Sequence, residues 1–507
     1  MGENLKTLLV SEYDKRLINN VHPANWKNPE PADCYNLVVI GAGTAGLVAA
    51  AGAAGLGAKV ALIERHLLGG DCLNVGCVPS KGIIRAGRAA HDVKTAGDFG
   101  INIPTGISID FNKAMERMRR LRAGMSAHDS AKRFSELGVD VFFGRGRFTG
   151  NDSIDVEETR LRFKKAAICT GARPTALAVP GIDEAGYLTN ENIFALTELP
   201  QRLAVIGAGP IGCELAQTFA RLGSKVTLLH LGGQVLPRDD AEAAEIIGRT
   251  LVRDGVDLRL QVKLARASKK GKEKLLVIEE DGKTTELFFD EILAGVGRTP
   301  NVEGLDLEKA GITYDQQQGV MVNERLRTSN ARVYAAGDIC SAYKFTHAAD
   351  AMARIVIANA LFRGRQTASS LVIPWCTYTD PEVAHVGMSE QEAREKGIAI
   401  HTLTVPLADV DRAVLDNETE GFARVHLKEG SDKILGATIV ARHAGEMISE
   451  LSLAMTTGSG LSSIAQTIHP YPTQAEAVKK LADAYNRTRL TPFVKKLLSA
   501  WLAWQRS

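Results

Sequence analysis

No part of this sequence is a long apolar run, since none reaches the roughly 18 residues that a helix needs to cross a bilayer. The N-terminal segment MGENLKTLLV also lacks the basic start and continuous apolar core of a secretory signal peptide. Lys6 stands where N-myristoylation requires Ser or Thr, so that modification is not expected. Together these absences predict a cytoplasmic protein.

Cysteine is scarce, and neither sign of charge dominates. A net charge of +2 gives no reason to expect nucleic acid as a partner. The 7 cysteines are odd in number and mostly scattered, at Cys34, Cys72, Cys77, Cys169, Cys213, Cys340 and Cys376. This pattern excludes the disulfide framework of a small secreted domain. Three of these residues, Cys169, Cys213 and Cys340, are expected to be inert buried thiols.

Glycine, in contrast, is plentiful, and its 48 residues gather in clusters. GAGTAG at 41–46 follows an apolar strand and opens a helix of small residues, after which a second strand ends at Glu64. GAGPIG at 207–212 repeats this order, and its second strand ends at His230 in the same register. Two in-register units of this kind predict two dinucleotide-binding domains of the βαβ type.

Each glycine in such a turn has a separate task. The first allows a tight bend, the second lets the backbone approach a pyrophosphate, and the third lets helix and strand pack closely. Glu64 can accept hydrogen bonds from an adenosine ribose, which suits FAD or NAD. His230 carries no negative charge to repel a 2′-phosphate, which favours NADPH over NADH, unless His230 merely ends a strand. The three positions are Gly41, Gly43 and Gly46 in the first unit and Gly207, Gly209 and Gly212 in the second.

Two cysteines, Cys72 and Cys77, lie close together in DCLNVGCVPSK at 71–81. Their separation is too long for a Cys-x-x-Cys zinc or thioredoxin-type pair, so no resident metal is predicted. The residues after Cys77 are typical of a helix start, and a helix N-terminus lowers a cysteine pKa from about 8.5. Two dinucleotides and two thiols therefore predict a relay, in which hydride passes from nicotinamide to flavin and electrons pass on to a disulfide.

GGDCLNVGCVPSK at 69–81 closely resembles the active-site signature of the pyridine nucleotide–disulfide oxidoreductases. That family includes glutathione reductase, dihydrolipoamide dehydrogenase and mercuric reductase. The resemblance covers about residues 36–487 and includes both glycine motifs, YAAGD at 334–338 and YTDPEVAHVG at 378–387. It implies an α/β fold with two Rossmann-like domains, for FAD and NAD(P), and a C-terminal α+β dimerisation domain, hence a homodimer.

The resemblance also implies a role for individual residues. Cys72 corresponds to the interchange thiol that meets the substrate, and Cys77 to the charge-transfer thiol beside the flavin. Lys81 and Glu214 correspond to the ion pair next to flavin N5, where a fixed positive charge stabilises the reduced ring. The other cofactor contacts that it implies are Gly171 and Asp338 for FAD and Gly297 for NAD(P).

One motif of the family is altered. Its His-Pro-Thr-x-x-Glu supplies an acid–base pair across the dimer, but IHPYPTQAE at 468–476 has Tyr471 at the histidine position, followed by Glu476. A tyrosine with a pKa of about 10 stays protonated where a histidine near about 6.5 exchanges a proton. Disulfide exchange therefore slows, whereas a soft metal ion bound by thiolates needs less proton shuttling. The pattern resembles mercuric reductase and predicts Hg(II), another soft metal or a thiol-bound acceptor.

Other acceptors stay open. Mercuric reductases usually add a C-terminal cysteine pair and often an N-terminal Cys-x-x-Cys domain, yet no cysteine follows Cys376 here and only Cys34 precedes the active-site pair. If His469 reaches the interchange thiol, the protein is a dihydrolipoamide dehydrogenase or another disulfide reductase. A non-catalytic flavoprotein partner is the third alternative, and it leaves the cysteine pair and Lys81 without a role.

Both ends of the chain are predicted to be helical. Apolar residues recur every four positions from Leu5 and Leu9 to Val21, as in an amphipathic helix. The segment 490–507 is basic and carries tryptophan, so it either packs on the body of the dimer or lies on an anionic membrane surface. The predicted domains are an N-terminal extension at 1–35, an FAD-binding domain at 36–184 and 298–365, an NAD(P)-binding domain at 185–297, a dimerisation domain at 370–487 and a C-terminal helix at 488–507.

Overall fold

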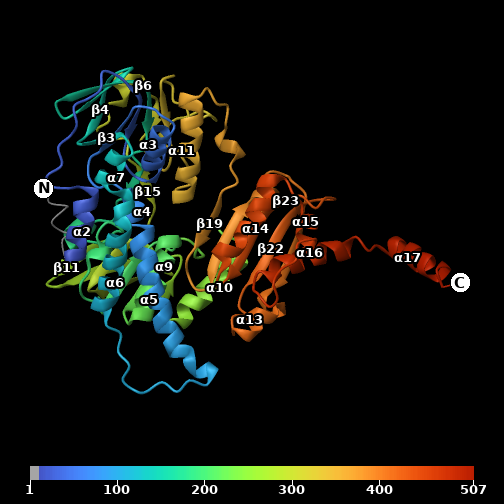
Figure 1. The fold of residues 1–507 in the computed structure, drawn as a ribbon. Coiled ribbons are helices and arrows are strands. Elements are labelled where there is room, and N and C mark those ends of the chain that lie inside the picture. Colours follow the sequence, from blue (N-terminus) through green and yellow to red (C-terminus); the bar gives the residue numbers. More distant parts are fainter. Residues whose placement is uncertain (1–10, 507) are drawn as a thin grey trace. The chain divides into compact units, whose positions relative to one another are not determined.

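The computed structural model describes residues 11–506, which form two compact units (Figure 1). One unit combines the residues up to 231 with 255–371, and the other combines 232–254 with 372–507. Helix α2 (Glu12–Val21) covers the second part of the predicted N-terminal helix. Leu5 and Leu9, on which the first part of that prediction rests, lie outside the described residues.

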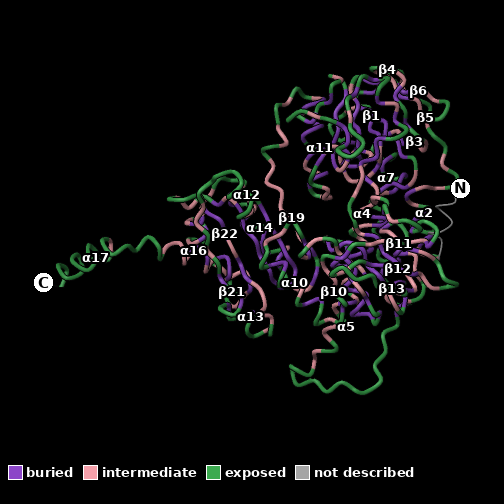
Figure 2. Tube along the Cα trace, turned by 180° about the vertical axis from the view of Figure 1, so that it is seen from behind, coloured by how far each residue is buried: buried purple, intermediate pink, exposed green. Residues whose placement is uncertain are grey.

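The first unit contains a Rossmann-type sheet whose central strand is β1 (Tyr35–Ile40). Alternate side chains of β1 enter two separate apolar cores. Leu37 and Val39 pack in the core that includes α3 (Thr44–Gly55) and α11 (Thr346–Leu361), whereas Val38 and Ile40 pack in the core on the opposite face. Burial on both faces explains why β1 is apolar without interruption from Leu37 to Ile40 (Figure 2). The other strands are β2 (Val60–Glu64), β3 (Val139–Phe143), β4 (Gly146–Gly150), β5 (Ser153–Val156), β6 (Thr159–Ile168) and β18 (Val333–Ala335).

A second parallel sheet in the same unit has the order β10–β9–β8–β14. Its crossover helix α9 (Pro210–Leu222) follows β8 directly. Two short strands, β7 (Ala172–Pro174) and β15 (Arg298–Pro300), pair antiparallel after β6 and β14 respectively. The predicted pair of Rossmann-like folds is therefore confirmed. The remaining strands are β8 (Arg202–Ile206), β9 (Lys225–Leu229), β10 (Asp257–Arg259), β14 (Glu291–Ala294) and the antiparallel β11 (Lys263–Lys270), β12 (Glu273–Glu280) and β13 (Lys283–Phe289).

Helices between β2 and β3 carry the cysteine motif. Helix α5 packs against both α6 and α9 (Figure 1). Gly87 of α5 faces α9, where a Cβ on it would make ordinary contact at 3.4 Å with the Cα of Thr218. The helices are α4 (Gly70–Asn74), α5 (Cys77–Thr95), α6 (Phe111–Met125) and α7 (Ala131–Glu136).

The second unit is an antiparallel sheet with helices, as predicted for an α+β domain. The strand order is β19–β20–β23–β22–β21. Leu451 of α14 and Leu481 of α16 lie in the apolar core with the sheet. Arg424 of β22 pairs at 2.8 Å with Asp240, the N-cap of α10. The elements are α10 (Ala241–Arg253), β19 (Pro374–Thr377), β20 (Glu382–Gly387), α12 (Glu390–Glu395), β21 (Ile400–Pro406), α13 (Asp411–Leu415), β22 (Phe422–Lys428), β23 (Ile434–Ala441), α14 (Ala444–Thr457), α15 (Leu461–Ala465) and α16 (Glu476–Thr488).

The last helix, α17 (Pro492–Trp504), has no buried residue (Figure 2). Its apolar side chains are exposed, by 74% at Phe493 and 55% at Trp501. Thr491 caps its N-terminus by accepting the N–H of Val494 at 3.3 Å. Within residues 11–506, no helix is both long enough and apolar enough to cross a membrane. The predicted amphipathic helix therefore forms, with its apolar side chains facing solvent in this chain.

Candidate active site

The glycine turn after β1 brings backbone against backbone. Gly41 has a φ of +98°, and a Cβ there would lie 2.5 Å from the carbonyl oxygen of Cys169. A Cβ on Gly46 would lie 1.8 Å from the carbonyl oxygen of Gly41. Gly43 is the N-cap of α3, and no side chain caps that helix. A bare helix N-terminus at such a turn attracts anions, so this cradle fits the pyrophosphate of a dinucleotide.

The turn after β8 has the same local geometry. Gly207 has a φ of +102°, and a Cβ there would lie 2.5 Å from the carbonyl oxygen of Gly295. A Cβ on Gly212 would lie 1.8 Å from the carbonyl oxygen of Gly207, and Gly209 is the N-cap of α9 without a side-chain cap. The first unit therefore contains two glycine turns of the same geometry, and each fits the pyrophosphate of a dinucleotide.

Glu64 and His230 occupy equivalent places beside the two turns. Glu64 Oε2 accepts the N–H of Ala42 at 2.7 Å, and His230 Nδ1 accepts the N–H of Ala208 at 3.4 Å. Burial raises the pKa of Glu64, although its bonds to backbone N–H groups oppose that shift. Burial lowers the pKa of His230, so its ring is neutral at neutral pH and brings no charge to a 2′-phosphate.

The two cysteines lie at the junction of α4 and α5. Both are free thiols, so the structure corresponds to the reduced pair. A hydrogen bond from the Cys72 thiol, assisted by Thr346 and the charge of Lys81, lowers the pKa of Cys77 to about 6. The same bond and burial raise the pKa of Cys72. At neutral pH the pair is therefore a Cys77 thiolate beside a Cys72 thiol.

An ion pair lies one turn further along α5. Lys81 Nζ is 2.9 Å from Glu214 Oε2, and the Glu214 side chain is only 6% exposed. Glu214 lies on α9, so this pair joins the cysteine helix to the helix of the second glycine turn. It also fixes a positive charge close to Cys77, which favours the thiolate.

Two glycines before Cys72 explain the start of its motif. Gly69 and Gly70 have φ values of +89° and +56°, and a Cβ on Gly70 would lie 2.6 Å from the Cα of Gly43. Only residues without a side chain can bring the cysteine segment this close to the first glycine turn. The thiols therefore lie beside the first dinucleotide cradle.

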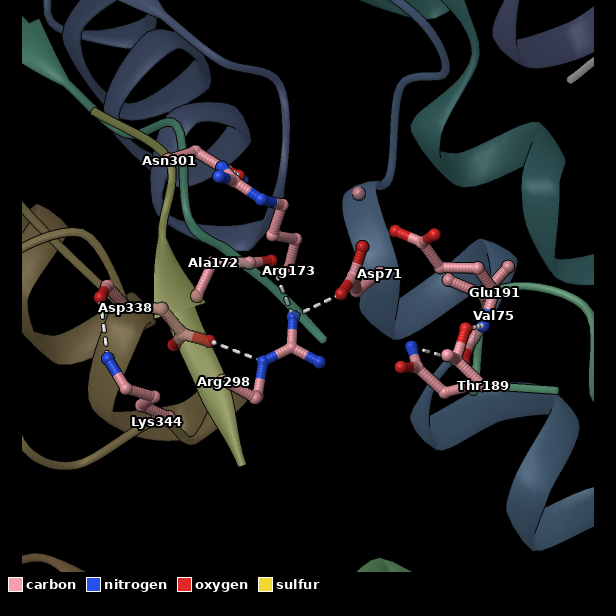
Figure 3. Close-up of polar contacts among 12 residues, drawn as sticks. Asp71, Val75, Ala172, Arg173, Thr189, Glu191, Arg298, Asn301, Asp338 and Lys344 are labelled. Carbon is pink, nitrogen blue, oxygen red and sulfur yellow. Dashed lines mark hydrogen bonds and ion pairs between the residues drawn. The ribbon is translucent and has the colours of Figure 1, made fainter. Parts of the chain in front are cut away.

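Arg298 is a half-buried residue of the site that the sequence analysis did not single out (Figure 3). Its guanidinium pairs with Asp71, lies 3.5 Å from Asp338 and donates to the carbonyl of Ala172 at 2.7 Å. Burial raises the pKa of Asp338, while the charge of Arg298 opposes that shift. Arg298 thus links the residue before Cys72 to the YAAGD motif. The available signal was its GRTP segment at 297–300, which follows the apolar run ILAGV at 292–296.

Gly297 directly precedes this arginine in the chain, and Gly171 is brought near it because β7 pairs with β15. Gly171 and Gly297 precede β7 and β15, with φ values of +66° and +123°. The carbonyl of Gly171 accepts the N–H of Asn301 at 3.0 Å, and the carbonyl of Gly297 accepts that of Thr175 at 3.0 Å. Both glycines therefore shape the paired strands that carry Arg298.

Tyr471 belongs to the second unit and is exposed by 70%. Its hydroxyl donates to Asp411 Oδ2 at 2.8 Å, and that carboxylate raises the pKa of Tyr471. Tyr471 therefore stays protonated at neutral pH and can donate a hydrogen bond but cannot accept a proton as a base.

His469 and Glu476 flank Tyr471. His469 Nε2 lies 3.0 Å from Glu450 Oε1, its Nδ1 lies 3.1 Å from the carbonyl oxygen of Thr467, and its side chain is 7% exposed. Glu476 begins α16, and its Oε2 is buried without a hydrogen-bond partner in the part of the chain that the structure describes. Both ring nitrogens of His469 thus face oxygen acceptors, whereas Glu476 keeps one oxygen for a further partner.

The three cysteines expected to be inert have surroundings that suppress reactivity. Cys169 and Cys213 are buried, and Cys340 is half-buried. Burial raises the pKa of Cys340 to about 12 and raises that of Cys169 as well. Thiols held protonated in this way are poor nucleophiles.

The Cys77 thiolate gives a pH prediction. Because its folded pKa of about 6 lies below the ordinary value of 9.0, ionisation stabilises the reduced protein fully above pH 9 and less as pH falls through 6. We expect the ultraviolet thiolate absorbance of the reduced protein, after subtraction of a Cys77→Ser spectrum, to rise with a midpoint near pH 6. A midpoint at pH 8 or above would contradict the described hydrogen bonding.

Comparison with protein families gives two matches. The pyridine nucleotide-disulphide oxidoreductase model matches residues 35–353, and the model of that family's dimerisation domain matches residues 373–482. The chain is 36% identical over 453 residues to a mercuric reductase of Staphylococcus aureus, which covers 89% of this chain and 83% of the relative. It is 34% identical over 464 residues to a dihydrolipoyl dehydrogenase of Thermus scotoductus, covering 89% and 98%.

Solved structures resemble the chain over the same extent. The HOCl-induced flavoprotein disulfide reductase RclA from Escherichia coli has a TM-score of 0.79 at 29% identity, covering 89% of this chain and 99% of that chain. LpdA from Mycobacterium tuberculosis has a TM-score of 0.80 at 26% identity, with the same coverage. The region that matches the family model, residues 35–353, contains both glycine turns and the cysteine pair.

Proposed function

This chain belongs to the pyridine nucleotide-disulphide oxidoreductase family, whose members use FAD and NAD(P)H, and from that premise we propose that it carries electrons from NADPH to a soft metal ion held by thiolates. The electrons pass through FAD and the Cys72–Cys77 pair. Hg(II) is the preferred acceptor in this proposal. The observation that carries it is Tyr471, an exposed phenol at the position where a base is needed for disulfide exchange.

The residues present fit both cofactors. FAD would be held by the turn of Gly41, Gly43 and Gly46 with Asp338, and it supplies two-electron transfer between the nicotinamide and the cysteine pair. Reduction of the disulfide takes the two electrons of one hydride and leaves a thiolate at Cys77 and a thiol at Cys72. Glu214 holds the ammonium group of Lys81 in place, with 2.9 Å between Nζ and Oε2. The positive charge of Lys81 thus lies near the Cys77 thiolate.

Acceptor binding then requires Cys72 to lose its proton. A soft metal ion lowers the pKa of a coordinating thiol so far that the proton leaves without a protein base. Two electrons convert Hg(II) to Hg(0), which matches the two electrons of one NADPH. In this proposal the Tyr471 hydroxyl turns from Asp411, to which it donates at 2.8 Å, and donates to the acceptor instead. The buried Oε2 of Glu476, which has no hydrogen-bond partner among the described residues, is available to accept a hydrogen bond there.

One solved relative is known in complex with a metal ion. One solved structure of Escherichia coli RclA, with a TM-score of 0.79, is a Cu(II) complex. Its 29% identity to this chain extends over 89% of the present sequence. A metal ion bound by a protein of this fold supports a metal acceptor over a purely organic one in this proposal.

The protein acts as a homodimer in this proposal, with Tyr471 and Glu476 contributed by the partner subunit. The match to a dimerisation domain at 373–482 supports it. Apolar side chains of the second unit are exposed, by 94% at Ile468, which lies close to Tyr471 in the sequence, and by 63% at Leu453 on α14. Exposed apolar surface of this kind is typical of a subunit interface.

A second candidate is a dihydrolipoamide dehydrogenase, favoured by the 34% identity to the Thermus scotoductus enzyme. It requires His469 to leave the Glu450 carboxylate, 3.0 Å from its Nε2, and accept the thiol proton. That rearrangement breaks both hydrogen bonds of a ring whose side chain is only 7% exposed, whereas Tyr471, exposed by 70%, gives up a single exposed hydrogen bond, which makes this candidate the weaker one.

The test is anaerobic NADPH oxidation with thiol-complexed Hg(II) and lipoamide in parallel. We expect turnover with mercury and almost none with lipoamide. Tyr471→Phe should lower mercury turnover roughly 5- to 10-fold, because one hydrogen bond worth about 1 to 1.4 kcal/mol is lost. The same preparation shows the nucleotide preference when the rates of flavin reduction by NADPH and NADH are compared.

His469→Gln is the matched variant, and it should leave mercury turnover unchanged. Rapid lipoamide turnover that His469→Gln abolishes would replace the metal proposal with the dehydrogenase. Reduction of the flavin without turnover on either acceptor would overturn mercury as the acceptor while leaving the first half of the relay intact.

A further inference from the structure

Helix α2 brings a buried charge to the cysteine segment, although it lies before residue 35, where the family match begins. Its Asp14 side chain is 1% exposed, and the facing Arg119 and Arg122 of α6 are 3% and 2% exposed. Burial of charged groups is expensive unless they are paired and hydrogen-bonded. None of these three residues has a place in the electron relay, so the cluster calls for a different explanation.

The cluster reaches the redox pair through Arg122. One guanidinium nitrogen, Nη2, donates to Asp14 Oδ1 at 2.7 Å, and the other, Nη1, donates to the carbonyl oxygen of Asn74 at 2.7 Å. Asn74 ends α4 and lies between Cys72 and Cys77 in the chain. A single guanidinium thus connects the N-terminal helix to the backbone of the cysteine loop.

Asn74 is itself a fixed point of that loop. Its side-chain Nδ2 donates to the carbonyl oxygens of Leu68 at 3.0 Å and Gly70 at 2.8 Å. The N–H of Leu68 in turn donates to the carbonyl of Val21, the last residue of α2, at 3.1 Å. Helix α2 therefore contacts the cysteine segment at two points, through the Asp14–Arg122 ion pair and through the backbone hydrogen bond from Leu68 to Val21.

Arg119 is a second buried cation beside Arg122, and the Asp14 carboxylate is the negative charge that faces both. Its Nε lies 3.9 Å from Asp14 Oδ2, and its Nη2 donates to the carbonyl of Leu196 at 2.6 Å. Without the carboxylate, two guanidinium groups remain buried side by side and repel each other. The arginine side chains would then turn toward water, and Arg122 would release Asn74.

We propose that Asp14 is a positioning residue for the redox pair: through Arg122 it holds the Asn74 carbonyl and thereby keeps the Cys72 thiol in hydrogen-bonding position on Cys77. This inference rests on the proposed function of the cysteine pair. It gives the N-terminal helix a role in the reaction without contact with any reacting atom.

The test compares Asp14→Asn with the parent holoenzyme. We expect the thiolate midpoint of reduced Cys77 to rise by roughly one pH unit, since about one hydrogen bond to the thiolate is weakened. Acceptor turnover should fall roughly tenfold, whereas the rate of flavin reduction by NADPH stays within about twofold. A purely structural role lowers the melting temperature and moves neither the midpoint nor the ratio of the two rates.

Glu12→Gln is the matched control on the same helix, because the Glu12 side chain is 84% exposed and pairs at 2.6 Å with Lys15, which is 62% exposed. It should leave all three measurements unchanged. If Asp14→Asn does not fold, Arg122→Lys tests the positioning role instead. Lysine keeps a cation beside Asp14 but cannot bond Asp14 and Asn74 at the same time. We expect Arg122→Lys to show the same shift in midpoint with a smaller loss of stability.

The outcomes separate the two proposals. A parent protein without a thiolate midpoint near pH 6 and without acceptor turnover overturns the proposed function. A parent with both, alongside folded Asp14→Asn or Arg122→Lys proteins that titrate and turn over as the parent does, overturns the positioning role alone.

Discussion

Replacement of Cys72 by serine is expected to reduce acceptor turnover by at least about a thousandfold, because the hydroxyl neither forms the redox disulfide nor binds a soft metal. Cys77→Ser should be equally inactive with the acceptor. The two variants differ in their thiols. Cys72→Ser keeps the Cys77 thiol, which titrates with a lowered pKa near Lys81, whereas Cys77→Ser removes it. Steady-state turnover and ultraviolet thiolate titration measure these effects.

Cys340→Ser serves as the control for cysteine loss, because that thiol is half-buried and its pKa is raised to about 12. It should retain turnover within about twofold. Appreciable acceptor turnover in Cys72→Ser would show that electrons leave the flavin by another route and that the pair is not obligatory.

The second large effect is expected from valine at the third glycine of each turn. A Cβ at Gly46 or Gly212 would lie 1.8 Å from a backbone carbonyl oxygen, so the strand and helix must separate and the cradle opens. Gly46→Val should yield a protein without bound FAD. Gly212→Val should keep FAD but weaken NADPH binding at least about 100-fold, equivalent to about 2.7 kcal/mol. Flavin absorbance of the purified proteins and NADPH titration of flavin reduction check both results.

Gly55→Val is the matched control, because Gly55 also belongs to α3 and a Cβ there meets nothing within 4 Å. It should bind FAD as the parent does. The assignment of the turns would be exchanged if Gly46→Val retained FAD and lost NADPH binding. Normal NADPH reduction in Gly212→Val would remove the second turn from nucleotide binding.

The features that the sequence determined by itself are local. The two glycine turns follow from residues at most five positions apart, and their strand–turn–helix context is a short-range pattern of apolar and small residues. The position of Cys77 at the start of a helix is equally local, since α5 begins at Cys77 itself. Fold class, both dinucleotide folds and the α+β domain could be predicted for this reason.

The partners that tune the cysteine pair were decided only by the tertiary structure. Thr346, 3.6 Å from Cys77, is separated from it by 269 positions, and Arg298 is separated from Asp71 by 227. Side chains so distant in sequence leave no periodic signal near the motif that they serve. Their contacts arise because parallel strands bring loops from remote segments to one edge of a sheet.

The N-terminal helix shows the same division. Its amphipathic spacing predicts a helix, and the buried Leu17 and Val21 agree with that pattern. No pattern indicates that Asp14, on the buried side, is paired with Arg122 at 2.7 Å, because charged residues in such a helix ordinarily face water. The sequence thus determined which segments are helices, strands and turns, while packing of those segments decided which charges are buried together and which of them hold the cysteine loop.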